Sequence, residues 1–306
     1  MKKNNWLILI FAVLFAFLIL FYLKIGNPSD HIIFSVRLPR IMLTFLTGFI
    51  LAGVGHTFQM MLDNPLAEPY ILGISSGAAF GSILAVVTGV FILMPIFGFA
   101  GALVTMFIVW GLAHLGGEFN SIKLLLSGII VGMFFSAVIS LLMYLNLQEI
   151  GNIINVLMGN LGRIFSRSEW SYFLIIFVIS ILLMIYLFLL SHKLTIMSTG
   201  DLVATSLGLE VKKLRRKIFI ISSLLTGITV SYAGIIGFVG LVVPHMVRIL
   251  ARGNKRYVMI VSAFAGAFLL IICDLIAKNI APIELPVGVI TAFIGCPFFI
   301  FILARK

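Results

Sequence analysis

Long uncharged, apolar runs follow one another through almost the whole of this 306-residue chain, and their lengths restrict what it can fold into. A helix needs roughly 20 apolar residues to cross a bilayer, and each run is close to that length. The separate runs are Trp6–Leu23, Ile41–Leu62, Leu124–Gln148, Trp170–His192, Tyr257–Cys273 and Leu285–Ala304. Only 10% of the residues are charged, too few for the surface of a soluble protein of this size.

Two further runs are longer than one crossing. Residues 69–117 carry Met94-Pro95 near the middle, which predicts two crossings and a turn. Residues 218–247 are rich in glycine and contain Pro244 in their second half, which predicts one crossing followed by a short, broken helix. The sequence therefore predicts an all-α polytopic membrane protein of about ten transmembrane helices. With no long polar stretch, residues 1–306 are expected to form a single transmembrane domain.

The first run could be mistaken for a secretory signal peptide. Its apolar stretch is longer than a signal's core, and no small-residue cleavage site precedes Lys24, so we expect a retained helix. The two cysteines, Cys273 and Cys296, form no metal-binding or disulfide pattern and are expected to pack in helices. No metal site is predicted.

A net charge of +11 would suggest nucleic-acid binding in a soluble protein, but here the positive-inside rule is a sufficient explanation. If both termini are cytoplasmic, most of the 21 basic residues fall inside the cell. Those left outside are Lys24, Arg37, Arg40, Arg163, Arg167 and Lys278. Arg37 and Arg40 flank Pro39 at the start of one external helix. They either snorkel to the membrane interface or form part of a binding surface.

The most polar segment is His192–Lys217, which this topology places in the cytoplasm. Ser198 or Thr199 is expected to cap a short helix that reaches Leu207, and Gly208 is a suitable stop. Such a helix would form a rigid projection on the cytoplasmic face, to which another protein could bind. The alternative is a basic loop that only anchors the topology.

The chain lacks the motifs of an ATPase and of a metalloprotease. No GxxxxGK[ST] loop and no HExxH occurs, and no paired catalytic set is visible, which argues against an intramembrane enzyme. Few ionisable residues fall in mid-membrane, namely His56 and Asp274, and the spacing of Asp274 and Lys278 predicts a local ion pair. An ion-coupled secondary carrier of a lipophilic solute usually needs buried carboxylates. That carrier is the alternative to a transporter with an external energy source, and dependence on an ion gradient rather than on ATP would identify it.

Several motifs occur together and in one order along the chain. They are Arg37-Leu38-Pro39-Arg40, Gln59 with Asn64-Pro65-Leu66-Ala67-Glu68-Pro69, Leu72–Ala78, Ser206-Leu207-Gly208, Gly237–His245, Asp274 and Glu284–Val289. In this combination the chain resembles the permease subunits of the iron-siderophore, haem and vitamin B12 ABC importers, which are type II importers. The resemblance covers residues from about 37 to 304.

The resemblance implies a ten-helix, vitamin B12 permease-like subunit in the cytoplasmic (inner) membrane. It implies a dimer with a second copy or a paralogue, two ATP-binding subunits, and an extracytoplasmic substrate-binding protein. ATP and Mg²⁺ would bind to the ATPase partners, and no cofactor is expected in this chain. The cargo would be a metal chelate, and nucleic acid is not an expected partner.

The resemblance also implies roles for individual residues. Arg37, Arg40 and Lys278 correspond to basic residues that dock the binding protein; Lys278 stands where arginine is common and cannot make a bidentate fork. The residues expected to couple to the ATPase are Ser206, Leu207, Gly208 and Leu209. Ser121 and Ile122 fall at the cytoplasmic gate. His56 and Gln59 either line the pathway or, for His56, make a hydrogen bond between helices.

Overall fold

The computed structural model describes residues 2–26, 28–115, 119–250 and 255–304, and within these ranges the chain forms helices and no strands. The elements in chain order are α1 (Lys2–Lys24), α2 (Asp30–Ile32), η1 (Ile33–Arg37), α3 (Leu38–Met61), α4 (Ile74–Val87), η2 (Phe91–Leu93), α5 (Met94–Ala113), α6 (Ser121–Leu145), η3 (Leu147–Glu149), α7 (Ile150–Met158), α8 (Arg167–Met197), α9 (Asp201–Ser206), α10 (Val211–Ala233), α11 (Val239–Leu250), α12 (Lys255–Asn279) and α13 (Val287–Ala304).

Each apolar run of the sequence corresponds to a helix of the described chain, with differences of a few residues at the ends, so the predicted all-α polytopic fold is confirmed. The spans long and apolar enough to cross a membrane are Asp30–Met61, Phe91–Ala113, Ser121–Leu145, Arg167–Met197 and Tyr257–Asn279. The shorter apolar helices are Val13–Lys24, Ile74–Val87, Val239–Ile249 and Val287–Phe301. The expected division of residues 69–117 and 218–247 into two helices each is also confirmed.

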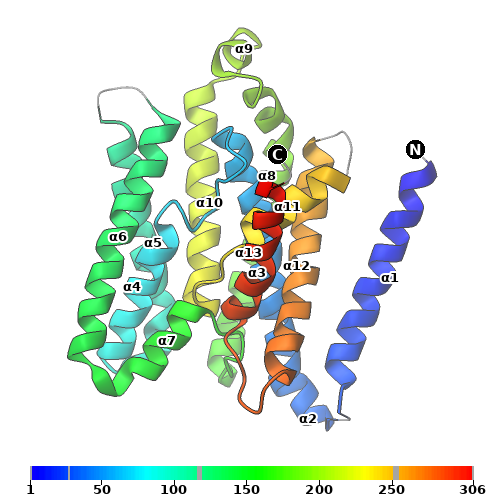
Figure 1. The fold of residues 1–306 in the computed structure, drawn as a ribbon, viewed down its shortest axis with the longest axis vertical. Helices are drawn as coiled ribbons and strands as arrows, with labels where there is room; N and C mark the ends of the chain where they lie inside the picture. Colours follow the sequence, from blue (N-terminus) through cyan, green and yellow to red (C-terminus); the bar gives the residue numbers. More distant parts are fainter. Residues whose placement is uncertain (1, 27, 116–118, 251–254, 305–306) are drawn as a thin grey trace.

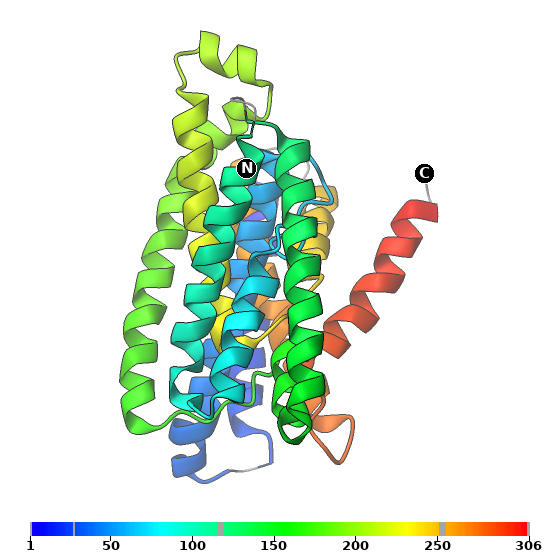
Figure 2. The ribbon, with the colours of Figure 1, turned by 90° about the vertical axis from the view of Figure 1, so that its left-hand side faces the viewer.

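The helices run between two ends of the molecule (Figure 1). The start of α1, the end of α13 and the short helix α9 lie at one end, called here the α9 end. The helices α2 and α7 and the connection between α12 and α13 lie at the other, the α2 end. Figure 2 shows α13 leaving the bundle towards its C-terminal end, where Ile300 and Phe301 are exposed.

Helix α3 forms the centre of the bundle. In the most apolar stretch of 18 residues within the span Asp30–Met61, 89% of the residues are buried. Helices α8, α10, α11 and α12 pack around α3. Two close backbone contacts set this packing. A Cβ on Gly48 would lie 2.4 Å from the carbonyl oxygen of Gly266 in α12, and one on Gly55 would lie 2.1 Å from that of Gly240 in α11. Small residues allow such approach in lipid, where apolar surface alone does not favour helix association.

Helices α4 and α11 are short, with 14 and 12 residues, and each follows a break in the chain. Residues 62–73 separate α4 from the central helix, and residues 234–238 separate α11 from α10. Prolines at 65 and 69 and the glycines at 234 and 237 explain both breaks, because neither residue type favours continuation of a helix.

The start of the short helix α9 differs from the prediction. Neither Ser198 nor Thr199 caps it, because α8 extends to Met197 and both hydroxyls donate to carbonyls of its last turn. The residue before α9 is Gly200, with a φ of +118°. Glycine adopts this conformation readily, whereas a residue with a side chain would be strained in it. The predicted stop is confirmed, since Gly208 follows α9 with a φ of +81°.

We expect Gly48→Ala to destabilise the bundle, because the added methyl group would overlap the backbone of α12. Overpacking of this kind costs about 1–3 kcal/mol. Thermal unfolding of the detergent-solubilised protein should show a lower Tm. The control is Gly111→Ala in α5, where no atom lies within 4 Å of the added Cβ. Equal Tm values for the two variants would contradict the close contact between α3 and α12.

Candidate functional site

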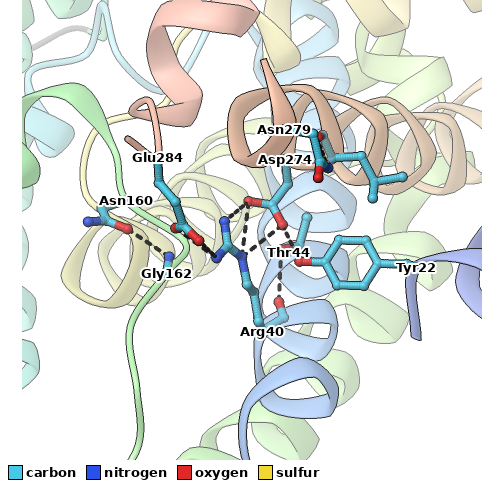
Figure 3. Close-up of polar contacts among 9 residues, drawn as sticks. Tyr22, Arg40, Thr44, Asn160, Gly162, Asp274, Asn279 and Glu284 are labelled. Carbon is cyan, nitrogen blue, oxygen red and sulfur yellow. Dashed lines mark hydrogen bonds and ion pairs between the residues drawn. The ribbon is translucent and has the colours of Figure 1, made fainter. Parts of the chain in front are cut away.

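A buried charge cluster lies at the α2 end, centred on Arg40 in the first turn of α3 (Figure 3). Its Nε donates to Asp274 Oδ2 over 3.0 Å and its Nη2 to Asp274 Oδ1 over 2.8 Å. Its Nη1 donates to Glu284 Oε2 over 2.9 Å, and the Tyr22 hydroxyl donates to Asp274 Oδ2. Asp274 is 1% exposed, so the guanidinium provides the pairing that a buried carboxylate requires.

This geometry bears on two expectations about the α2 end. Arg40 is only 7% exposed and its donors are directed at carboxylates of the same chain, so it lies beneath the surface, and its role in docking stays a prediction. Among the described residues, the salt bridge of Asp274 is with Arg40 and not with Lys278. The spacing of four residues did bring Lys278 near, but a bidentate guanidinium satisfies the buried carboxylate better than a single ammonium.

The other two predicted docking residues, Arg37 and Lys278, lie beside the same cluster. Arg37 Nη1 donates to the carbonyls of Tyr22, Leu23 and Ile25, over 3.2, 3.0 and 2.7 Å, and so satisfies the last turn of α1. The Lys278 ammonium lies 6.0 Å from the centre of the Tyr22 ring. Both side chains are half-buried. The structure thus brings all three basic residues together around Tyr22, a residue without any distinguishing signal in the sequence.

Glu284 gives this basic cluster an acidic edge. Its side chain is 49% exposed and lies in the connection between α12 and α13, next to the backbone of Gly162. The sequence motif contained Glu284 but did not reveal its partner, because 244 residues separate it from Arg40. The α2 end therefore presents Glu284 together with the half-buried Arg37 and Lys278.

At the opposite end, α9 carries the predicted coupling residues. Ser206, Leu207 and Gly208 are exposed and Leu209 is half-buried. Leu202 and Leu207 are 89% and 65% exposed, whereas Ala204 is buried against the bundle. The apolar side chains of this segment therefore project away from the bundle. Two glycines with positive φ, Gly200 and Gly208, lie on either side of it.

The predicted gate residues lie at the first turn of α6. The Asn120 side chain caps this helix by accepting from the backbone N–H groups of Ile122, over 2.8 Å, and Lys123, over 3.2 Å. Ile122 is 74% exposed and Ser121 is half-buried. The cap fixes the direction in which α6 begins, and hence the position of both residues.

The predicted pathway residues His56 and Gln59 lie inside the subunit. They are 1% and 3% exposed. Gln59 donates from Nε2 to the Gly240 carbonyl over 3.3 Å and accepts from Arg248 Nη2 over 2.8 Å. It therefore joins α3 to α11. Both side chains are thus enclosed between helices of the described chain, and their role along a pathway stays a prediction.

A buried carboxylate in the connection between α3 and α4 was not identified as a site from the sequence. Glu68 is 9% exposed. Burial raises its pKa to about 7, and a hydrogen bond from the backbone of Phe238 opposes that rise. Phe238 directly precedes α11, so Glu68 connects the two breaks of the bundle. In the sequence, Glu68 was only one member of the motif at 64–69.

Among the described residues, no group of three His, Cys, Asp or Glu side chains is arranged to hold a metal ion. The arrangement at the two ends is suited to contact with other proteins. At the α2 end, Arg37, Lys278 and Glu284 form a charged rim. At the α9 end, Leu202 and Leu207 project as exposed apolar side chains.

The sequence matches the FecCD transport family over residues 4–305. It is 39% identical to the Fe(3+)-citrate import system permease protein YfmD of Bacillus subtilis, with 92% of this chain and 83% of that protein covered. It is 35% identical to the vitamin B12 import system permease protein BtuC of Serratia proteamaculans, with 92% and 84% covered.

The fold is also that of a solved transporter. A metal-chelate type ABC transporter in an inward-facing conformation superposes with a TM-score of 0.88 at 28% identity, over 99% of this chain and all of that one. The resemblance to the permeases of iron-siderophore, haem and vitamin B12 ABC importers is thereby confirmed. The chain belongs to the FecCD transport family and is a transport permease rather than an enzyme.

Proposed function

We propose that this chain is the membrane subunit of an ATP-driven importer that moves a metal chelate into the cytoplasm. The observation that carries the proposal is α9, whose leucines are held out from the bundle. Exposed apolar side chains on a rigid element are typical of a protein contact. The chelate as cargo is supported by the relatives named for Fe(3+)-citrate and vitamin B12 import. The proposed cargo is an iron-siderophore, haem or cobalamin.

The charge distribution supports an orientation for the permease in the cytoplasmic membrane. Basic residues follow α9 at one end of the bundle: Lys212, Lys213, Arg215, Arg216 and Lys217. Cytoplasmic segments carry such an excess, so the α9 end is proposed to face the cytoplasm, together with both termini. Residues 1–306 then form one permease domain.

The proposed assembly has three kinds of component, namely permease subunits, ATP-binding subunits and a binding protein. A second permease copy or a paralogue would complete the dimer. Two ATP-binding subunits, which bind ATP and Mg²⁺, would sit on the α9 end and contact Ser206, Leu207, Gly208 and Leu209. Their approach would move α9, and Ser121 and Ile122 at the start of α6 are proposed as the gate that responds.

An extracytoplasmic binding protein would dock on the α2 end. The half-buried Arg37 and Lys278 are the basic groups proposed to meet acidic residues of that protein. Arg40 is proposed to act from within, by holding Asp274 and α12 in position beneath the rim. Rim charges contribute to the association rate more than to the final affinity.

The ATPase contact is tested by placing a charge on α9. We expect Leu202→Asp and Leu207→Asp to weaken assembly with the ATP-binding subunits, because each puts a carboxylate into an apolar contact. Co-purification and ATP-dependent uptake of the chelate should both fall. The matched control is Thr205→Ala, which alters α9 at an exposed polar residue. Full assembly and uptake in both aspartate variants would contradict the proposal.

The docking contact is tested by charge reversal. We expect Lys278→Glu, combined with Arg37→Gln, to slow binding of the purified substrate-binding protein to the permease in nanodiscs. The difference from wild type should shrink at high salt, since the Debye length falls from about 10 Å at 0.1 M to about 3 Å at 1 M. Arg167→Gln, an exposed basic residue at the start of α8, is the control. Equal binding at low salt would exclude a docking role for Arg37 and Lys278.

Arg40 should behave differently from these rim residues. We expect Arg40→Met to lower the free energy of unfolding by about 3–5 kcal/mol, because it leaves Asp274 buried and unpaired. The double variant Arg40→Met/Asp274→Leu should recover most of that loss. Thermal unfolding in detergent measures both. A single variant as stable as wild type would show that the buried pair does not hold α3 to α12.

A further inference from the structure

Arg215 in the second turn of α10 joins two segments that contact different parts of the proposed machinery. Its Nη2 donates to both carboxylate oxygens of Asp201, over 2.7 and 3.0 Å. Asp201 is the first residue of α9. The arginine is 7% exposed, while the Asp201 side chain is 57% exposed. Through this ion pair, the buried guanidinium of Arg215 connects α10 to the projecting helix α9.

The face of the same guanidinium covers an aromatic ring. The Arg215 Cζ lies 4.4 Å from the centre of the Phe119 ring, within the range of a cation–π contact. Phe119 directly precedes Asn120, the residue that caps α6. Its ring also lies 5.8 Å from that of Trp110 and 5.6 Å from that of His114, both in or next to the last turn of α5. The start of α6 is therefore packed against Arg215.

We propose that Arg215 is a positioning residue that transmits displacement of α9 to the first turn of α6. The inference rests on the proposed contact between α9 and the ATP-binding subunits. When α9 moves, Asp201 moves with it, and the buried guanidinium follows because it cannot be left without its carboxylate at low cost. Phe119 then follows the guanidinium, and Asn120, Ser121 and Ile122 follow Phe119.

Arginine is the side chain suited to this role. Its planar group binds a carboxylate through its edge and an aromatic ring through its face at the same time, which an ammonium does not reproduce. The neighbouring ion pair between Glu210 and Lys213 differs in this respect. Its side chains are 69% and 76% exposed, so it has no buried contact through which to transmit movement and serves as the comparison.

The test uses the full complex of permease and ATP-binding subunits in nanodiscs. Cys273 and Cys296 are replaced by alanine, and Ile122→Cys, at an exposed position, provides a thiol whose labelling rate reports on the start of α6. We expect the rate to differ between the nucleotide-free and the ATP-bound complex. Asp201→Asn and Phe119→Leu should each remove most of that difference. Arg215→Lys, which keeps the charge, should remove it too.

Two further comparisons separate transmission from a general structural effect. Because the two contacts act in series, the double variant Asp201→Asn/Phe119→Leu should lose no more of the response than either single variant. Lys213→Gln, which breaks the exposed ion pair, should keep the response. Losses that add in the double variant, or an unchanged response in the single variants, would overturn the proposal.

Assembly and ATP hydrolysis distinguish this inference from the proposed function. Leu202→Asp tests whether α9 binds the ATP-binding subunits at all, so normal assembly of that variant contradicts the proposed function. The relay variants are expected to assemble and hydrolyse ATP while the response at position 122 is lost. Failure of Asp201→Asn and Phe119→Leu to assemble would overturn the relay, since it would assign Arg215 a role in holding α9 in place.

Discussion

Close backbone contact between α3 and its neighbours is the interaction on which the rest of the structure depends. In a bilayer, apolar surface alone does not bring helices together, so contact relies on packing and internal hydrogen bonds. The pairs Gly48–Gly266 and Gly55–Gly240 place α12 and α11 directly against α3. With α3 enclosed, its large polar side chains bond to partners inside the protein. Arg40 does so near its start and Gln59 near its end.

The two ends of the bundle use a buried arginine in contrasting ways. Arg40 and Arg215 are both 7% exposed, but Asp274 is 1% exposed while the Asp201 side chain is 57% exposed. A fully desolvated pair is costly to separate, so Arg40 holds α3 and α12 together. At the α9 end only the arginine is desolvated, so Arg215 ties a projecting helix to the bundle instead of joining two buried helices. That difference suits a fixed surface at the α2 end and a movable element at the α9 end.

Much of this architecture could be predicted from local features of the sequence. The lengths of the apolar runs predicted the helices and the gap before α4, and the glycines and Pro244 of residues 218–247 predicted the break before α11. Gly208 predicted the end of α9. The start of α9 was predicted wrongly because serine and threonine are good caps in general, whereas here the chain turns at Gly200 and the two hydroxyls bond within α8.

The sequence by itself determined the membrane class, the order of helices and the family, since hydrophobicity, chain-breaking residues and motif order are local properties. Tertiary structure alone decided which charges are paired. Arg40 finds Asp274 at a separation of 234 residues, and Arg215 finds both Asp201 and Phe119. These pairings exist because desolvation makes an isolated charge costly, so each buried group takes whichever partner the packed helices bring within reach. No spacing rule along the chain contains that information.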